Sequence, residues 1–317
     1  MAKILANDGI SISGVEKLKN AGFEVITTKV AQEQLVNFIN ENTIDALLVR
    51  SATEVRKNLL DSCPSLKLIG RGGVGMDNID VTYATSKGIH IINTPAASSE
   101  SVAELVFAHL YGGVRYLFDA NRNMPLEGDS KFNQLKKSYS AGTELKGKTL
   151  GIIGFGRIGQ ATAKIALGVG MKVIFTDNEI ESLDLKLDFY DGQSITFKLE
   201  NNTLDTVLKE ADFITVHVPA QKEYILSSQE FSKMKDGVGI INASRGGTVD
   251  EVALIKALEK NKVSFAGLDV FESEPNPEIR ILMDSKISLT PHIGAATLEA
   301  QDRIGLELAE QIITLLK

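Results

Sequence analysis

A glycine-rich hexapeptide, Gly154-Phe155-Gly156-Arg157-Ile158-Gly159, lies between a short apolar run and a segment with helical periodicity. The apolar run, Thr149 to Ile153, predicts a β-strand, and Gln160 to Leu167 predicts a helix. In this context the first glycine permits a tight turn, the second lets the backbone approach a pyrophosphate, and the third allows helix and strand to pack closely. The helix N-terminus then faces an anion. The pattern therefore predicts a dinucleotide site.

An acidic residue bears on which dinucleotide is bound. A second apolar run, Met171 to Phe175, is followed by Asp177, 18 residues beyond Gly159, where a carboxylate can accept hydrogen bonds from the adenosine ribose. This carboxylate would repel a ribose 2′-phosphate, and residues 178–181 include no Arg or Lys to bind one. We therefore expect NAD rather than NADP.

Composition limits the class of protein. A chain of 317 residues suggests about two domains, and 43% hydrophobic with 24% charged residues indicates a soluble protein with ample core material. The net charge of -7 argues against a general nucleic-acid surface. No apolar stretch approaches the roughly 18 residues that a membrane span needs. We expect a cytoplasmic protein without nucleic-acid or membrane partners, in which the single cysteine, Cys63, has a structural or incidental place.

Strand patterns alternate with helical patterns along the chain, which predicts α/β folding with parallel sheets. In the first 95 residues, strands are expected at Lys3–Ala6, Glu24–Thr27, Ala46–Val49, Leu66–Gly70 and His90–Asn93, with helices at Ile12–Ala21 and Gln32–Asn40. After the glycine motif, strands are expected at Met171–Phe175, Phe213–Val218, Gly239–Asn242, Phe265–Leu268 and Ile287–Leu289. We also expect a helix within Pro95–Gly113, an irregular segment at Asn121–Gly142 and a long closing helix at Ala295–Leu316.

Four histidines compete for a role in acid/base chemistry, for which imidazole is suited because its ordinary pKa is about 6.5. His90 falls within a strand pattern and His109 within an apolar helix, so we expect both to be packed structural residues. His217 ends a strand pattern, without an acidic neighbour in sequence. His292 follows Pro291 at a strand end, where open α/β sheets place functional groups. His292 is therefore the best candidate.

Two further strand ends carry charged residues. The segment Leu268 to Pro275 contains three carboxylates, one of which can orient an imidazole and raise its pKa. The segment Asn242 to Gly247 contains Arg245, whose guanidinium can hold a substrate carboxylate through two parallel hydrogen bonds. Acids and arginines in loops are also commonly solvated, so neither segment decides the function alone.

Together these segments resemble the D-isomer-specific 2-hydroxyacid dehydrogenases, and the resemblance covers essentially the whole chain. It rests on the glycine motif, Asn242–Gly247, Leu268–Phe271 with Glu274-Pro275, and Pro291-His292-Ile293-Gly294. The resemblance implies two domains with Rossmann-like and flavodoxin-like parallel sheets. A NAD-binding domain, residues 96–290, would be inserted into a substrate-binding domain of residues 1–95 and 291–317, and a homodimer would form largely through the inserted domain.

The resemblance also implies roles for individual residues. Arg245 would bind the substrate carboxylate, His292 would be the acid/base and Glu274 its paired carboxylate, with no metal needed. The implied cofactor neighbours are Val74, Gly154, Gly156, Arg157, Ile158, Gly159, Asp177, Val218, Ala243, Asp269 and Gly294. Val218 departs from the polar residue expected there, so one hydrogen bond near the cofactor is in doubt. The implied substrate neighbours are Arg50, Ser51, Arg71, Gly73, Val74, Gly75, Arg245 and His292.

Further similarities within the family favour a phosphorylated 2-hydroxy acid as substrate. They are Val49–Thr53, Gly70–Asn78, Asn93-Thr94-Pro95 and Gly142–Leu145. Arg50 and Arg71 each follow a strand pattern and can supply positive charge for a phosphate. Two alternatives stay open: a glyoxylate, hydroxypyruvate or D-lactate type of reductase, and an NAD-sensing binding protein of the corepressor kind. Some family members carry a C-terminal module that senses serine; because this chain ends at Lys317 after the closing helix, we expect no feedback inhibition of that type.

Overall fold

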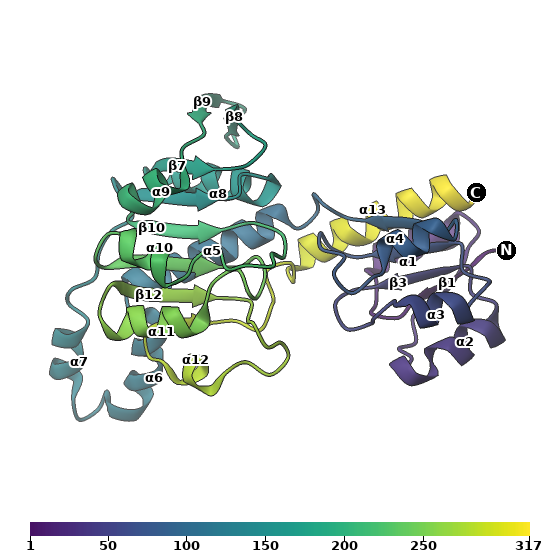
Figure 1. Ribbon diagram of the computed structural model, residues 1–317, viewed down its shortest axis with the longest axis horizontal. Coiled ribbons are helices and arrows are strands. Elements are labelled where there is room, and N and C mark those ends of the chain that lie inside the picture. Colours follow the sequence, from purple (N-terminus) through teal and green to yellow (C-terminus); the bar gives the residue numbers. More distant parts are fainter. The chain divides into compact units, whose positions relative to one another are not determined.

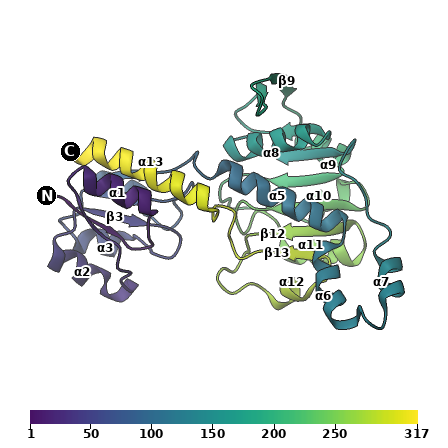
Figure 2. The ribbon, with the colours of Figure 1, turned by 180° about the vertical axis from the view of Figure 1, so that it is seen from behind.

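The chain folds into two compact units, and the computed structural model describes all residues from 1 to 317 (Figures 1 and 2). Unit 1 contains Met1–Ser101 and Ala295–Lys317, and unit 2 contains Val102–Gly294. The predicted boundaries at 95/96 and 290/291 fall a few residues short of these. The second boundary moves because the backbone N–H groups of Ile293 and Gly294 are hydrogen-bonded to Asp269 of unit 2.

Unit 1 is a five-stranded parallel sheet with the strand order β2-β1-β3-β4-β5. Its strands are β1 (Lys3–Ala6), β2 (Glu24–Ile26), β3 (Ala46–Val49), β4 (Leu68–Arg71) and β5 (His90–Asn93). Its helices are α1 (Ile12–Asn20), the 3-10 helix η1 (Gln32–Gln34), α2 (Leu35–Asn42), α3 (Lys57–Ser62), α4 (Val81–Ser86) and α13 (Leu298–Leu316). Apolar side chains of α1 and α13 pack on one face of the sheet, and those of α2, α3 and α4 on the other.

Unit 2 is a six-stranded parallel sheet with the order β13-β12-β11-β10-β6-β7. Its strands are β6 (Thr149–Ile153), β7 (Lys172–Thr176), β10 (Phe213–Val216), β11 (Val238–Asn242), β12 (Val263–Leu268) and β13 (Ile287–Leu289). An antiparallel hairpin, β8 (Ser182–Asp188) and β9 (Ser194–Glu200), follows β7. The helices are α5 (Ser99–Val114, beginning in unit 1), α6 (Leu117–Glu127), α7 (Phe132–Ser138), α8 (Arg157–Gly168), α9 (Leu204–Glu210), α10 (Ser228–Lys233), α11 (Glu251–Glu259) and α12 (Ile279–Met283).

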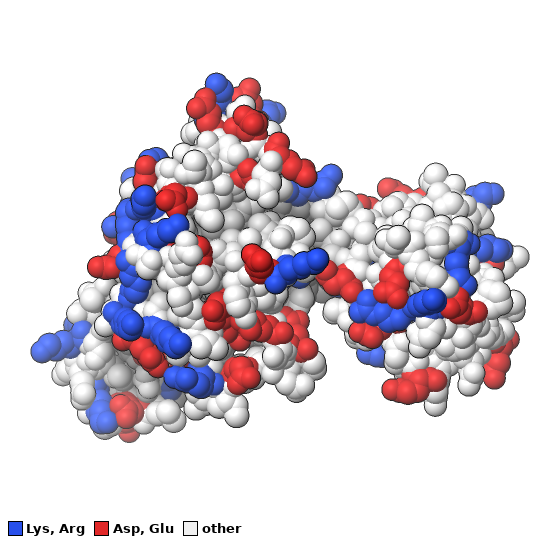
Figure 3. All heavy atoms as spheres, in the orientation of Figure 1, with Lys and Arg blue, Asp and Glu red and all other residues white.

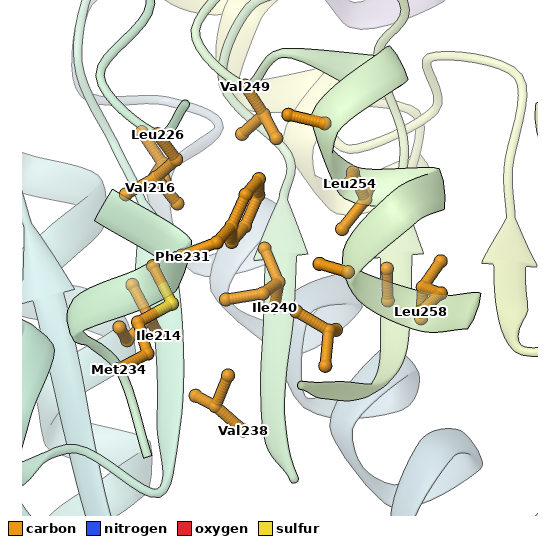
Figure 4. Close-up of a cluster of buried hydrophobic side chains, with 14 of the residues drawn as sticks. Ile214, Val216, Leu226, Phe231, Met234, Val238, Ile240, Val249, Leu254 and Leu258 are labelled. Carbon is orange, nitrogen blue, oxygen red and sulfur yellow. The ribbon is translucent and has the colours of Figure 1, made fainter. Parts of the chain in front are cut away.

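Each face of the unit 2 sheet has its own hydrophobic cluster. Helices α5 and α8 cover one face, where Phe155, just inside the glycine motif, stacks on Phe175 with ring centroids 3.9 Å apart. Helices α9 to α12 cover the other, and Figure 4 shows Phe231 of α10 directed toward Ile240 of β11. Burying a side chain of this size stabilises the fold by about 1.5–3 kcal/mol. Hydrophobic packing therefore stabilises both faces of the sheet that carries the glycine motif.

The predicted α/β class with two parallel sheets is confirmed. The irregular segment expected at Asn121–Gly142 is wrong, because it contains most of α6 and all of α7. His90 is exposed rather than packed, since β5 is an edge strand and this side chain faces solvent. His109 is buried as expected, with 3% of its surface exposed.

On the face drawn in Figure 3, Lys and Arg side chains are interspersed with Asp and Glu side chains in both units. Several of them form ion pairs, such as Lys172 with Glu210 and Lys262 with Asp236. None of the helices combines the length and the apolar character that a transmembrane helix requires.

Candidate active site

The glycine motif at the carboxyl end of β6 has the geometry of a pyrophosphate cradle. Gly154 has φ +90°, and a Cβ there would collide with the backbone carbonyl of His217. Gly159 packs against the backbone of Gly154, so it also has no room for a side chain. Gly156, in contrast, faces open space, with no atom within 4 Å of an added Cβ. The loop is therefore closed where helix and strand meet and open where a ligand would lie.

The N-terminus of α8 differs from those of α1, α11 and α13. In α1, α11 and α13 a side chain accepts a hydrogen bond from the first turn: Ser11, Asp250 and Thr297 respectively. The N-cap of α8 is Gly156, which has no side chain to do this. The N–H groups of its first turn are left for another acceptor, and a phosphate suits both these donors and the helix dipole. These residues fit the pyrophosphate of a dinucleotide.

Asp177 follows β7 and joins the glycine motif to the next loop. Its Oδ2 accepts from the Phe155 N–H at 2.6 Å, and its Oδ1 accepts from the N–H groups of Glu179 at 2.8 Å and Ile180 at 3.1 Å. Burial opposes its charge, but these three donors outweigh burial and lower the pKa of Asp177. A charged carboxylate therefore stands beside the glycine loop, where a ribose diol could bind and a 2′-phosphate would be repelled.

The other cofactor candidates surround this motif or lie at neighbouring strand ends. Arg157 is exposed at the start of α8, Ile158 is half-buried beside it, and Ala243 is buried at the end of β11. Val218 is half-buried and packs against the cluster under α9 to α12. The neighbouring His217 ring bonds Thr215 Oγ1 through Nε2 at 3.0 Å, and burial lowers its pKa to about 3. A histidine that stays neutral in this way is not suited to exchange protons at neutral pH.

His292 and Glu274 form a hydrogen-bonded pair in unit 2. His292 Nδ1 lies 2.8 Å from Glu274 Oε2, and Glu274 Oε1 accepts from the Phe271 N–H at 3.0 Å. The His292 side chain is 42% exposed, so its Nε2 edge can meet a ligand. Burial opposes the charge of Glu274, but the hydrogen bonds from His292 and Phe271 and the charge of Arg245 lower its pKa overall. A cavity of about 340 Å³ opens beside the pair, lined by Phe271, Glu274, Pro275, Pro277, Leu282, Leu289, Thr290, Pro291 and His292.

Asp269 accepts hydrogen bonds from residues on both sides of His292 in the sequence. This carboxylate, 1% exposed, accepts from the Thr290 hydroxyl at 2.6 Å and from the N–H groups of Ile293 and Gly294 at 2.8 Å each. His292 adopts φ +54°, a conformation that non-glycine residues seldom take without support. The sequence indicates Asp269 only as a cofactor neighbour; its contacts show that it also shapes the His292 loop.

Arg245 follows β11, where a buried network fixes its backbone. The Asn242 amide donates to the Arg245 carbonyl and to Thr248 Oγ1, both at 3.0 Å. The guanidinium donates to the Ser244 carbonyl at 2.7 Å. Because the charge of Arg245 lowers the pKa of Glu274, Arg245 lies in the same electrostatic environment as the pair of His292 and Glu274. Unit 2 thus brings together the three residues that the sequence indicates for catalysis.

Arg50 and Arg71 lie at the carboxyl ends of adjacent strands of unit 1, where Val49 pairs with Arg71. The loop after β3 is held by Asp8, which accepts from the N–H groups of Arg50 at 2.7 Å and Thr53 at 3.1 Å. Burial lowers the pKa of the Arg50 guanidinium, and the charge of Asp8 opposes this shift. Arginine remains charged even so. The carboxyl edge of the unit 1 sheet therefore carries two half-buried guanidinium groups, those of Arg50 and Arg71.

The loop after Arg71 contains three further substrate candidates, Gly73, Val74 and Gly75. Gly73 has φ +149°, and a Cβ there would collide with the Arg71 guanidinium. The Gly73 N–H donates to the Arg71 carbonyl at 3.0 Å, so it is already engaged. Val74 and Gly75 follow at the surface, with Val74 39% exposed and its carbonyl held by the Asn93 amide at 2.8 Å. Ser51, on the neighbouring loop, is exposed.

Comparison with known proteins places this chain in a family. Residues 107–294 match the model of the D-isomer-specific 2-hydroxyacid dehydrogenase NAD-binding domain. A hydroxypyruvate reductase of Thermotoga maritima is 42% identical over 98% of this chain and 97% of its own length. A D-3-phosphoglycerate dehydrogenase of Bacillus subtilis is 38% identical over the whole chain, but the chain spans only 57% of that relative.

A solved structure agrees with these relatives. The D-lactate dehydrogenase of Aquifex aeolicus, complexed with NAD and lactic acid, is 30% identical, with a TM-score of 0.74, and the match covers 100% of this chain and 95% of that one. The cradle formed by Gly154, Gly156 and Gly159 and the charged Asp177 fit the NAD that the family model implies. The chain is a member of the D-isomer-specific 2-hydroxyacid dehydrogenase family, an oxidoreductase with an NAD-binding domain in unit 2.

Proposed function

We propose that the protein oxidises D-3-phosphoglycerate to 3-phosphohydroxypyruvate with NAD, the first step of serine biosynthesis. The observation that carries this choice is the pair Arg50 and Arg71 at adjacent strand ends of unit 1. A phosphorylated acid needs positive charge at the end away from its reacting carbon, and arginine binds phosphate in a planar, two-pronged geometry. Relatives named D-3-phosphoglycerate dehydrogenase, at 37–39% identity, support this choice.

Arg245 is the proposed carboxylate ligand. Its guanidinium can hold the carboxylate with two parallel hydrogen bonds, and its charge can also polarise the carbonyl that develops at C2. These contacts hold the C2 hydroxyl in one orientation. Holding a reacting group in one orientation lowers the barrier of the reaction.

His292 is the proposed acid/base. Its Nδ1 is bonded to Glu274, so Nε2 is the atom that takes the C2 hydroxyl proton during oxidation and returns it during reduction. Glu274, whose lowered pKa keeps it charged, stabilises the imidazolium that forms. Bound NAD supplies the acceptor for the hydride that leaves C2. Residues of this chain thus bind and orient the acid and move its proton.

A second candidate is the reduction of hydroxypyruvate or glyoxylate. It is favoured by the Thermotoga maritima relative, which has nearly the same length as this chain and is named a hydroxypyruvate reductase. The two candidates share the fold and the catalytic set, and they differ in whether Arg50 and Arg71 contact a phosphate. A third role, NAD sensing without turnover, would leave the dinucleotide site intact and the acid unconverted.

A substrate comparison tests the proposal. NADH formation is followed with NAD and D-3-phosphoglycerate, D-glycerate or D-lactate at equal concentrations, with the product removed; NADH consumption is followed with 3-phosphohydroxypyruvate, hydroxypyruvate and glyoxylate. Selective turnover of the phosphorylated pair supports the proposal. Preference for the unphosphorylated acids overturns it in favour of the reductase, and NAD binding without any turnover favours the sensor.

We also propose that the protein works as a cytoplasmic homodimer that associates through unit 2. Support for this association comes from large apolar side chains exposed on α6 and α7, including Leu117 at 55%, Leu126 at 77% and Phe132 at 56%. Side chains of this kind gain stability when a partner covers them. The molar mass in solution, measured for the wild type and for Leu126→Glu, tests this point. A monomeric wild type would overturn it.

A further inference from the structure

A line of part-buried hydrogen bonds connects α5 with the loop that carries His292. It begins at Ser288, whose hydroxyl lies 2.8 Å from His109 Nδ1, and continues from His109 Nε2 to Thr290 Oγ1 at 3.1 Å. Thr290 in turn donates to Asp269 Oδ1 at 2.6 Å. His109 comes from α5, far from the strand-end loops in sequence. Nothing in the proposed chemistry so far uses it.

The line fixes the tautomer of His109. The Thr290 hydroxyl has one hydrogen, which is donated to Asp269, so its oxygen can only accept from His109. His109 Nε2 therefore carries a hydrogen, and Nδ1 accepts from the Ser288 hydroxyl. Burial lowers the pKa of His109, and Asp269 only partly opposes that shift, which favours the neutral ring that these hydrogen bonds require. Every polar atom of this buried ring then has a partner.

We propose that His109 is a positioning residue for His292, acting through Thr290 and Asp269. The Nε2–H of His109 directs the Thr290 hydroxyl toward Asp269. Asp269 can then hold the N–H groups of Ile293 and Gly294, which keep His292 at its positive φ and beside Glu274. This role rests on the proposed function of His292 as the acid/base, but not on which acid is the substrate.

A purely space-filling role is the alternative. The His109 ring packs against Gly267 of β12, where an added Cβ would come within 2.6 Å of His109 Cβ. Leucine would fill much of this volume without offering a donor, whereas the glutamine amide can donate to Thr290 and accept from Ser288. The pair His109→Leu and His109→Gln therefore separates packing from hydrogen bonding.

The kinetic test uses these variants with Thr290→Val, which removes the hydroxyl that links His109 to Asp269. Turnover is measured with the acid that the wild type converts best. We expect His109→Leu to lower kcat roughly 10–100-fold with little change in KM, the loss typical of a catalytic group misplaced by about 1 Å. We expect His109→Gln to recover most of that loss. In the Thr290→Val background, His109→Leu should have little further effect on kcat.

Independent, multiplying losses in the double variant would overturn the proposal, as would equal losses for the leucine and glutamine variants or unchanged kcat in His109→Leu. A second measurement does not depend on turnover. The ¹⁵N spectrum of histidine-labelled wild type at pH 8, assigned through the signal missing in His109→Gln, should show the Nε2–H tautomer at His109. The Nδ1–H tautomer would also overturn the proposal. Absence of wild-type turnover with every acid would instead contradict the proposed function.

Discussion

At the amino ends of their strands, the two sheets are built alike. Asp45, just before β3, accepts from the N–H of Lys3 at 2.9 Å and from Lys67 Nζ at 2.7 Å. Asp212, just before β10, accepts from the N–H of Thr149 at 2.8 Å and from Lys235 Nζ at 2.8 Å. In each sheet the aspartate precedes the strand that lies between those of its two partners. In each sheet, one carboxylate therefore links three neighbouring strands through its hydrogen bonds to a backbone N–H and a lysine.

At the carboxyl ends the two sheets differ. Unit 1 carries Arg50 and Arg71, whereas unit 2 carries the glycine motif, Asp177 and the pair His292 and Glu274. Charges at the amino ends bind one another and the strand backbones, which serves folding. We propose that those at the carboxyl ends bind ligands, as is usual in open α/β sheets. Substitutions at the two edges should therefore separate stability from activity.

The largest effect is expected at the carboxyl edge of unit 2. His292→Gln should lower kcat about 10²–10⁴-fold, because a general acid/base contributes on that order. NAD affinity and the thermal midpoint should stay near the wild-type values, since the ring is exposed and the glycine motif is elsewhere. Steady-state kinetics and NAD titration measure this. The matched control is His90→Gln, an exposed histidine of unit 1, and equal losses in both variants would contradict the assignment.

The next effect is expected at the carboxyl edge of unit 1. Arg50→Ala should raise KM for D-3-phosphoglycerate roughly 10–100-fold, the equivalent of a lost charged hydrogen bond of about 1.5–3 kcal/mol. KM for D-glycerate should change little. Arg56→Ala, which removes an exposed arginine paired with Glu54 and Asp80, serves as the control. If both substrates suffer equally from Arg50→Ala, Arg50 does not bind the phosphate.

At the amino ends of the strands, we expect substitutions to lower stability and not activity. Asp212→Asn and Asp45→Asn should each lower the free energy of unfolding by about 1–3 kcal/mol, because a backbone N–H and a lysine lose a charged acceptor. Urea unfolding measures this loss, and kcat should be unchanged. Asp205→Asn is the control, because its ion pairs with Lys233 and Lys209 are exposed and should contribute little. A fall in kcat without a fall in the free energy of unfolding would contradict the assignment of Asp45 and Asp212 to stability.

The smallest effect is a dependence on pH. Burial opposes the charge of Asp45 and Asp212, but the lysines and backbone donors outweigh it and lower both pKa values. A carboxylate with a lowered pKa in the folded state stabilises the fold above its unfolded pKa of about 3.9 and loses that contribution as the pH falls. The difference in unfolding free energy between wild type and Asp212→Asn should therefore narrow below about pH 4. A constant difference from pH 7 to pH 3 would contradict the shift.

Much of this arrangement is predictable from local pattern. Strands β1, β3, β6 and β13 have the predicted bounds, because their apolar runs are short and bounded by turn residues. Likewise, the glycine motif and the residues that form the His292 and Glu274 pair carry signals over a few positions.

Other features depend on contacts that local pattern does not contain. The exposure of His90 follows from the place of β5 at the sheet edge, and the line from His109 to Asp269 joins residues about 160 positions apart. Helices α6 and α7 bury few of their own side chains, so their sequence lacks an apolar stripe. The hairpin β8–β9 is not among the predicted strands. Its alternation of Leu183, Leu185 and Leu187 with charged residues is nevertheless a pattern that indicates a strand.

The bonding of Asp177 has a consequence for coenzyme engineering. Exchanging this acid for a residue without a side-chain acceptor, such as alanine, would remove the repulsion of a 2′-phosphate but also the acceptor for the N–H groups of Phe155, Glu179 and Ile180. The loop that receives the pyrophosphate would be loosened together with the charge, so affinity for both coenzymes would fall. In this scaffold, a redesign toward the phosphorylated coenzyme should keep Asp177 and add cations at the exposed positions Asn178 and Glu179.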